Sequence, residues 1–222
     1  SALSNLIRYA PQAIWPEALS ITRKIRRDFS KVIVLGAMAQ HSSEDLYPEI
    51  LSLTQKIENE SALIWALSII MPHLPEELCN EALSIIRKIE DISDQAVLLC
   101  QIARHLSGLW PEALDSIRTI EDEFKRATAL QIVAQDIPED GWNQSLEITR
   151  EIQDKSEQAA GLVIMAKKVP SLWIEALNVT AEIEAESNRA SRLLSLLPYL
   201  PKSRQPEALN IAQHIRDEFN QV

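Results

Sequence analysis

The stretch from Trp110 to Asp122 reads WPEALDSIRTIED, and its opening phrase Pro-Glu-Ala-Leu decides the fold because it returns along the chain. The same four residues stand at 16–19 and 206–209, and degenerate copies lie between them. When the leucine of the phrase is taken as an anchor, the copies follow one another at intervals of 31 or 32 residues. The seven anchors are Leu19, Leu51, Leu83, Leu114, Leu146, Leu177 and Leu209. Such regular spacing predicts a repeat architecture.

Each copy reads as two helices. The first helix follows an acidic turn, as in residues 126–137, whose apolar side chains fall on one helical face before Pro138 ends the helix. The second helix begins at Pro-Glu, because proline in the first helical position loses no hydrogen bond and glutamate favours the positive helix end. Short turns force neighbouring helices to pack antiparallel. The sequence therefore predicts an all-α protein, an α-solenoid of about seven antiparallel helix-pair repeats with a period of 31–32 residues.

Length and composition support this fold class. The chain has 222 residues, with 4 glycines, 5% aromatic residues and 46% hydrophobic residues. A β-sandwich needs turn glycines and more aromatic residues, and the glycine-rich nucleotide-binding folds need glycine clusters, so these classes are excluded. The copies fill residues 1–222, which predicts a single repeat domain. Because the chain begins at Ser1 instead of methionine, we expect it to be a fragment of a longer protein.

The net charge, the cysteine count and the missing motifs indicate the class of partner, the cellular compartment and the absence of catalysis. The formal net charge is -10, which disfavours nucleic acid as a partner because a phosphate-binding protein normally carries a basic face. Cys79 and Cys100 are too few for a disulfide framework, which predicts a cytoplasmic protein, and no apolar run reaches the roughly 18 residues of a membrane span. The sequence contains no Gly-x-Ser-x-Gly, His-Glu-x-x-His or P-loop motif. We therefore expect no enzyme activity, no cofactor and no bound metal.

The two-helix unit resembles the tetratricopeptide and HEAT-like class of solenoids. Its recurring phrases Glu-Ala-Leu, Ile-Glu-Asp, Arg-Ala and Leu-Pro resemble the degenerate helical repeat arrays of bacterial, often cyanobacterial, multidomain proteins. In those proteins the array often follows a regulatory NTPase of the STAND or NACHT type and acts as its sensor. The resemblance covers nearly the whole chain, and it implies a sensor or interaction role without catalysis.

An aromatic column lies four residues before the anchors. It contains Trp15, Tyr47, Cys79, Trp110, Trp142, Trp173 and Gln205. The column has two interpretations. It could form a ladder that grips a peptide along one rim, or each large side chain could pack on the neighbouring copy at the helix entrance.

A second column, four residues after the anchors, is rich in arginine. It contains Arg23, Gln55, Arg87, Arg118, Arg150, Ala181 and Gln213. These arginines could bind carboxylates or phosphates, or could form local (i, i+4) pairs with Asp91, Asp122 and Asp154. Arg23 lacks such an aspartate because Arg27 takes its place. We therefore predict that Arg23, Lys24, Arg26 and Arg27 form the one unpaired basic patch.

Two further columns favour structural roles. His41, His73 and His105 fall in one column, where a cation near a helix C-terminus is favourable and the other ligands of a metal site are missing. The acidic turns recur once per copy, which indicates helix capping and solubility. The acidic residues are Asp91, Asp122, Asp154, Asp217, Glu60, Glu123, Glu186 and Glu218.

The sequence favours a non-catalytic protein-interaction or ligand-sensing scaffold whose partner is a protein or peptide. The predicted partner-binding residues are Arg23, Lys24, Arg26, Arg27, Trp15, Tyr47, Trp110, Trp142, Trp173, Arg87, Arg118 and Arg150. The alternative is a structural spacer or oligomerisation module, which would self-associate through an uncapped end at Leu209, Ile211 and Ile215. The interaction hypothesis predicts surface residues that break the consensus in adjacent copies on one face.

Overall fold

A computed structural model describes residues 14–41, 43–213 and 215 of the chain. Within these residues the elements are thirteen α-helices joined by turns and one-turn 3-10 helices, and no strand occurs. This confirms the all-α class. The chain divides into two compact units, Ser1–Ser116 and Ile117–Val222, and each is described by itself. The single solenoid domain stays a prediction.

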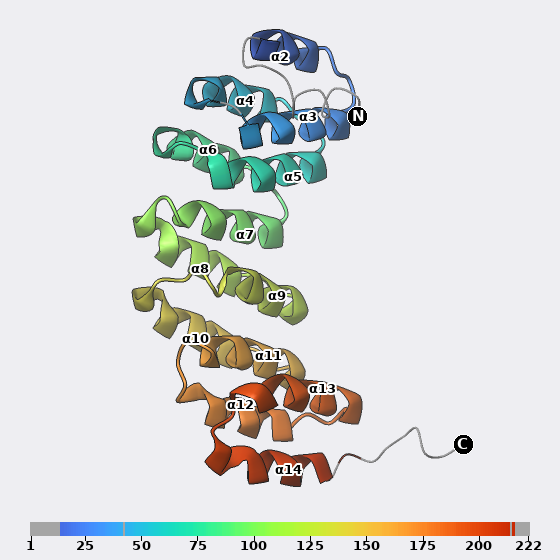
Figure 1. The fold of residues 1–222 in the computed structure, drawn as a ribbon, viewed down its shortest axis with the longest axis vertical. Helices are drawn as coiled ribbons and strands as arrows, with labels where there is room; N and C mark the ends of the chain where they lie inside the picture. Colours follow the sequence, from blue (N-terminus) through green and yellow to red (C-terminus); the bar gives the residue numbers. More distant parts are fainter. Residues whose placement is uncertain (1–13, 42, 214, 216–222) are drawn as a thin grey trace, which may run out of the picture. The chain divides into compact units, whose positions relative to one another are not determined.

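The helices alternate along the chain as the sequence predicts (Figure 1). We call those that follow an acidic turn A helices and those that begin at the Pro-Glu phrase B helices. In the first unit the A helices are α3 (Asp28–His41), α5 (Glu60–Ile70) and α7 (Ile92–Ala103), and the B helices are α2 (Trp15–Arg23), α4 (Tyr47–Thr54), α6 (Cys79–Ile86) and the greater part of α8 (Trp110–Arg118). In the second unit the A helices are α9 (Glu123–Val133), α11 (Lys155–Ala166) and α13 (Glu186–Leu196), and the B helices are α10 (Trp142–Arg150), α12 (Leu172–Ala181) and α14 (Gln205–Gln213).

The acidic turns start the A helices by capping them. The side chain of Asp122 accepts a hydrogen bond from the backbone N–H of Lys125, and Asp91 and Asp154 cap α7 and α11 in the same way. The side chain of Asn59 caps α5. Such a cap satisfies a backbone donor that the helix itself cannot pair. It explains why α9 begins three residues before the predicted start at position 126, and the capping role of these aspartates is confirmed.

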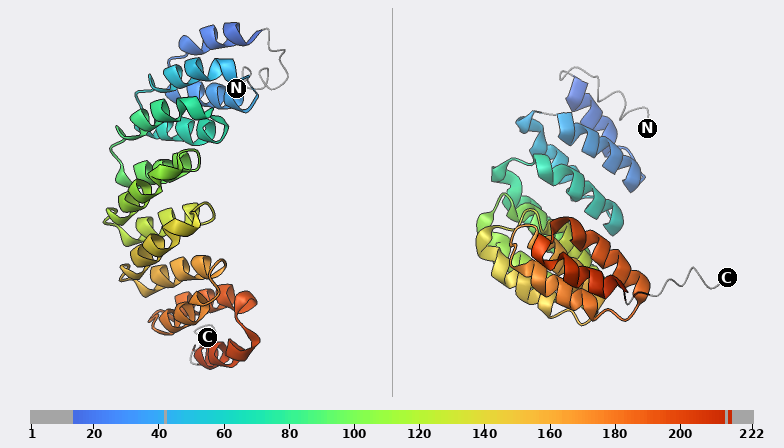
Figure 2. Two further views of the ribbon diagram at one scale, coloured as in Figure 1. Left: turned by 90° about the vertical axis from the view of Figure 1, so that its left-hand side faces the viewer. Right: turned by 60° about the horizontal axis from the view of Figure 1, so that its bottom comes forward.

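The cores of the two units form where successive A helices pack against each other and against B helices. In the first unit α3 packs against α5, α5 packs against α7, and both views of Figure 2 agree with Figure 1 that α3 and α5 lie side by side. A Cβ atom on Gly36 of α3 would lie 2.9 Å from Cγ2 of Ile69 on α5, so glycine permits this close approach. In the second unit α11 lies against α9, α10, α12 and α13. There a Cβ atom on Gly161 would lie 2.7 Å from Cγ2 of Thr149.

Candidate functional site

Carboxylates at the start of several A helices bind the backbone of the next acidic turn. Asp28 accepts hydrogen bonds from the backbone N–H groups of Glu58 and Asn59, at 3.1 and 3.0 Å. Glu60 binds the N–H groups at positions 90 and 91, and Glu123 binds those at 153 and 154. Acidic residues were predicted to act in caps and in solubility, and these three also join successive copies within a unit. We call them the turn-binding carboxylates.

The carboxylate of Asp28 makes the stability of the first unit depend on pH. The backbone N–H of Asn59 lowers the pKa of Asp28 below its ordinary value of 3.8, the ammonium of Lys31 lowers it further, and partial burial opposes both. A lowered folded pKa contributes stability above the unfolded value of about 3.8, and this contribution is lost as the pH falls through the folded pKa. In urea unfolding, the advantage of the natural chain over Asp28→Asn should therefore shrink as the pH falls below about 5. Asp45→Asn removes the same charge at an exposed position and serves as the control variant.

The arginine column forms ion pairs with the glutamate of the Pro-Glu phrase one copy later. Arg87 donates two hydrogen bonds from Nη2 to the carboxylate of Glu112, at 2.9 and 2.8 Å. Arg150 donates from Nε and Nη2 to the two carboxylate oxygens of Glu175, and this contact lowers the pKa of Glu175 and raises that of Arg150. The (i, i+4) interpretation is therefore wrong for these two arginines. Where Gln144 replaces the glutamate, Arg118 contacts Glu147 and Glu151 instead.

The aromatic column lies in the core. Trp15, Tyr47, Trp110 and Trp173 are buried, and Trp142 is partly buried. The hydroxyl of Tyr47 donates to the carbonyl oxygen of Ala39 on the preceding A helix, and the ring of Trp173 stacks on that of Tyr199. Cys79 fills the same place in its copy, and burial raises the pKa of its thiol. This burial leaves the rings little surface for a partner and is the packing that the second interpretation predicts.

Histidines of the histidine column lie at helix ends. His41 and His73 lie in the last turns of α3 and of the 3-10 helix Met71–His73 that follows α5. No group of three or more His, Cys, Asp or Glu side chains in the described part of the chain is arranged to hold a metal ion. Among the helices described, none combines the length and the apolar character needed to cross a membrane.

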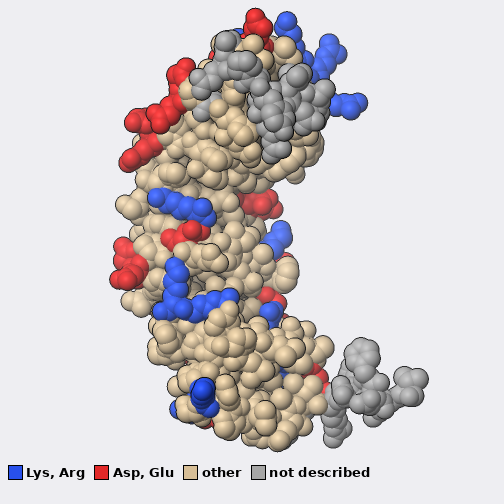
Figure 3. Space-filling model, viewed as in Figure 1, with Lys and Arg blue, Asp and Glu red and all other residues tan. Residues whose placement is uncertain are grey.

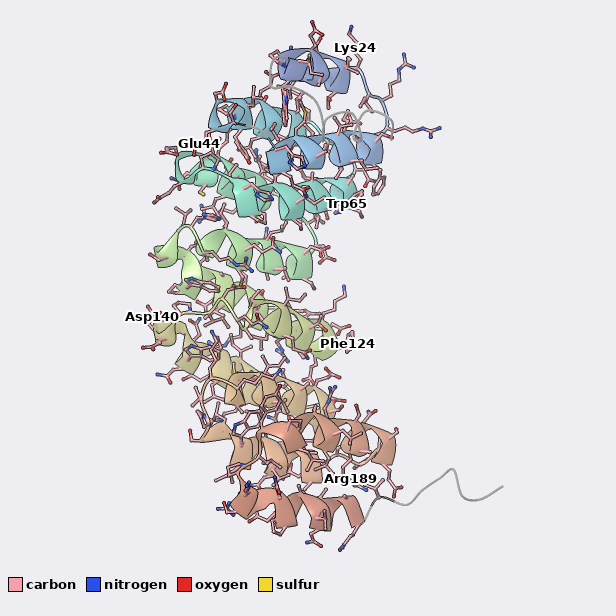
Figure 4. The ribbon with its side chains drawn as sticks, in the orientation of Figure 1. Lys24, Glu44, Trp65, Phe124, Asp140 and Arg189 are labelled. Atoms are coloured by element: carbon pink, nitrogen blue, oxygen red, sulfur yellow. The ribbon has the colours of Figure 1, made fainter. Side chains whose placement is uncertain are left out.

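The basic patch differs from its prediction in one residue. Nη2 of Arg23 lies 2.5 Å from Oε1 of Glu49, so Arg23 is paired and its prediction as an unpaired cation is wrong. The reason is again the glutamate one copy later, which reaches across from α4. Lys24, Arg26 and Arg27 are exposed in the turn between α2 and α3, and the described residues supply no ion pair to any of them. Figure 3 shows basic side chains gathered in this region, and Figure 4 labels Lys24.

An apolar surface directly follows these cations on α3 and α5. Phe29 is 50% exposed, Ile33 is 38% exposed and Trp65 is 42% exposed, and the rings of Phe29 and Trp65 lie 6.2 Å apart between centroids. Figure 4 labels Trp65 on α5. Together with Lys24, Arg26 and Arg27 they make a surface that we call the basic–apolar surface.

The apolar residues of this surface break the consensus of the copies. Phe29 stands ten residues after its anchor, while Ile33 and Trp65 stand fourteen after theirs. The equivalent residues elsewhere are Ser61, Ser93, Phe124, Ser156 and Ser187 in the first position, and Val97, Thr128, Ala160 and Ser191 in the second. Small or polar residues thus prevail, but two adjacent copies in the first unit carry large apolar ones. These columns were available in the sequence, and the prediction of partner-binding residues missed them.

Comparison with known proteins does not assign the chain to a family. No family model matches it, and neither does any curated protein. The crystal structure of Ton1535 from Thermococcus onnurineus NA1 is similar, with 17% sequence identity and a TM-score of 0.38, over 96% of this chain and 74% of that chain. A likeness of this size carries no argument about function.

Proposed function

We propose that this protein is a non-catalytic interaction module that binds an acidic, amphipathic segment of a partner protein through the basic–apolar surface. The observation that carries the proposal is the exposed contact between Phe29 and Trp65, next to three cations without ion pairs among the described residues. Single exposed apolar residues are common, but an exposed aromatic pair beside Ile33 is a contiguous patch. Aromatic and arginine side chains are also the residue types that dominate binding energy at interfaces.

Charge supports an acidic partner. The chain has a net charge of -10, so most of its surface repels an acidic segment, while the turn of Lys24, Arg26 and Arg27 attracts one. Local complementarity of this kind favours correct orientation and a fast association rate. An amphipathic helix would present apolar residues to Phe29 and Trp65, with its acidic residues beside the cations.

The proposal also includes an α-solenoid fold and a sensor role. We propose that the alternating A and B helices belong to one α-solenoid. Small bends summed over its repeats would transmit the binding of the partner, as in the sensor part of a larger regulatory protein. Cys79 and Cys100 are buried and are not joined in a disulfide, which suits the reducing cytoplasm.

A displayed library of peptides with mixed acidic, basic and apolar positions tests the proposal. The full chain should select peptides that combine acidic residues with an apolar face at helical spacing. Fluorescence anisotropy should then give an affinity that Trp65→Ala weakens by about 30-fold or more, as expected of a residue at the centre of an interface. The double variant Arg26→Glu/Arg27→Glu should slow association, most strongly at low salt.

Two matched variants control this experiment. Phe124 is an exposed aromatic residue in the same column as Phe29 but lies in the second unit, and Lys202 is an exposed cation there. Phe124→Ala and Lys202→Glu should leave the affinity unchanged. Selection of peptides without acidic residues, or equal losses for Trp65→Ala and Phe124→Ala, would refute the proposed surface.

The alternative function is a structural spacer that self-associates. Leu209 on α14 is 61% exposed, whereas Ile211 and Ile215 pack partly against the core of the second unit. Light scattering over a range of concentrations separates the two functions. A mass that rises with concentration and returns to that of a monomer in Leu209→Gln would favour the spacer, and a constant monomer mass would count against it.

A further inference from the structure

A small pocket on the first unit is lined by three cationic side chains from three elements. Its lining residues are Thr22, Arg23, Lys31, Leu53 and Lys56. Its volume of about 280 Å³ lies just below the roughly 300–1,000 Å³ that hold drug-sized ligands. The pocket is therefore suited to a compact ligand with negative charge.

Lys31 lines the pocket while it is paired with a carboxylate on its own helix. Its position, twelve residues after the anchor, holds Gln95, Gln158 or Arg189 in three other copies. Those side chains donate hydrogen bonds to backbone carbonyl oxygens at or just beyond the end of the preceding B helix, at Ile89, Arg150 and Ile183 respectively. Lys31 donates to Oδ1 of Asp28 at 3.1 Å and lines the pocket. Arg126 and Arg189, at the equivalent positions, pair in the same way with Glu123 and Glu186.

The three cations have N–H donors that are not used in their contacts within the chain. Arg23 uses Nη2 for Glu49, and a guanidinium group has five N–H donors. Lys31 uses one contact with Asp28, whose Oδ2 is already bound by two backbone N–H groups. Lys56 is exposed at its place in the lining and has no ion pair with any residue that the structure describes. The three cations of the lining outnumber the two carboxylates, Asp28 and Glu49, with which Arg23 and Lys31 pair.

The pocket is separate from the basic–apolar surface. Lys31 lies two residues from both Phe29 and Ile33 on α3, which places it about 160° around the helix axis from each. We propose that this pocket binds a small phosphate-bearing ligand, with Arg23, Lys31 and Lys56 donating to the phosphate oxygens. Arginine and lysine are the side chains that proteins use to hold phosphate.

The test titrates the full ¹⁵N-labelled chain with inorganic phosphate at constant ionic strength and follows amide chemical shifts. We expect a saturable 1:1 response confined to the lining residues and their neighbours in α2, α3 and α4. Lys56→Ala and Lys31→Gln should each weaken binding by about tenfold or more, because each removes a charge-assisted donor. The glutamine should keep the fold, because other copies carry it at this position. A second titration with O-phosphoserine separates free phosphate from a phosphate monoester as the preferred form.

Lys88→Ala is the matched control. Lys88 occupies the position of Lys56 one copy later, where Gln55 and Leu63 replace Arg23 and Lys31. We expect no change in phosphate affinity for Lys88→Ala, nor for Trp65→Ala. The proposed phosphate site and the proposed peptide-binding surface are therefore tested separately. A linear, non-saturating response overturns the proposal. So does an equal loss in Lys88→Ala and Lys56→Ala, or an affinity that survives Lys56→Ala.

Discussion

Replacing Leu162 with alanine is expected to lower the free energy of unfolding by about 2–5 kcal/mol. Leu162 lies on α11, is fully buried, and belongs to the core cluster that also contains Trp173, Leu193 and Leu196. The substitution loses the transfer free energy of the removed carbon atoms and leaves a cavity, which the packed helices can close only in part. Urea denaturation followed by circular dichroism measures the change.

The control is the same substitution at an exposed leucine of the second unit. Leu194 on the neighbouring helix α13 is 69% exposed, so Leu194→Ala should change the free energy of unfolding by less than about 0.5 kcal/mol. Leu162 lies in the core of the second compact unit, so hydrogen exchange in Leu162→Ala should accelerate mainly in that unit. Similar losses from the two substitutions would contradict the assignment of Leu162 to the core.

Features that depend on neighbours along the chain could be predicted from the sequence. Asp122 caps α9 as predicted because its acceptor and the N–H of Lys125 are three residues apart, so no distant part of the fold is involved. The placement of proline and glutamate at the start of the B helices is local in the same sense. The all-α class follows from repetition of these local signals, and it is confirmed.

Features that depend on the next copy were harder to predict. The spacing places Trp110 at the entrance of a helix, but whether another helix covers its ring depends on tertiary packing, so two interpretations stayed open. For Arg87 the only partner proposed within the chain was the local Asp91, although the observed partner Glu112 belongs to a glutamate that recurs in several copies. A comparison of each arginine of the column with the glutamate of the Pro-Glu phrase in the next copy would have found this pair.

The candidate site was predicted in part. Lys24, Arg26 and Arg27 were singled out because the copies elsewhere carry acid in this turn, and their side chains are exposed. Phe29 and Trp65 were missed because an apolar residue on a helix is ordinarily assigned to the core. Their exposure depends on the face of α3 and α5 that the neighbouring helices leave uncovered, and helical periodicity by itself does not fix that face.

Replacing Glu123 with alanine is expected to lower the free energy of unfolding by about 1.5–3 kcal/mol. Its carboxylate accepts hydrogen bonds from the backbone N–H groups of Gln153, at 3.0 and 3.1 Å, and of Asp154, at 2.8 Å. These donors lie thirty residues away, so the contact fastens one acidic turn to the preceding A helix within the second unit. Alanine removes a charged acceptor from both donors at once, and urea denaturation measures the loss.

The length of the side chain at position 123 provides the discriminating comparison. Asp28 makes the same contact from the equivalent position in the first unit, so Glu123→Asp should keep more of the stability than Glu123→Ala. Glu139 is exposed in the 3-10 helix before α10, and Glu139→Ala removes the same charge without a comparable cost. If Glu139→Ala were as destabilising as Glu123→Ala, overall charge and not the turn contact would be the cause. A loss specific to Glu123 that aspartate partly restores would be due to the contacts of this carboxylate, which are the two backbone N–H groups and the ion pair with Arg126.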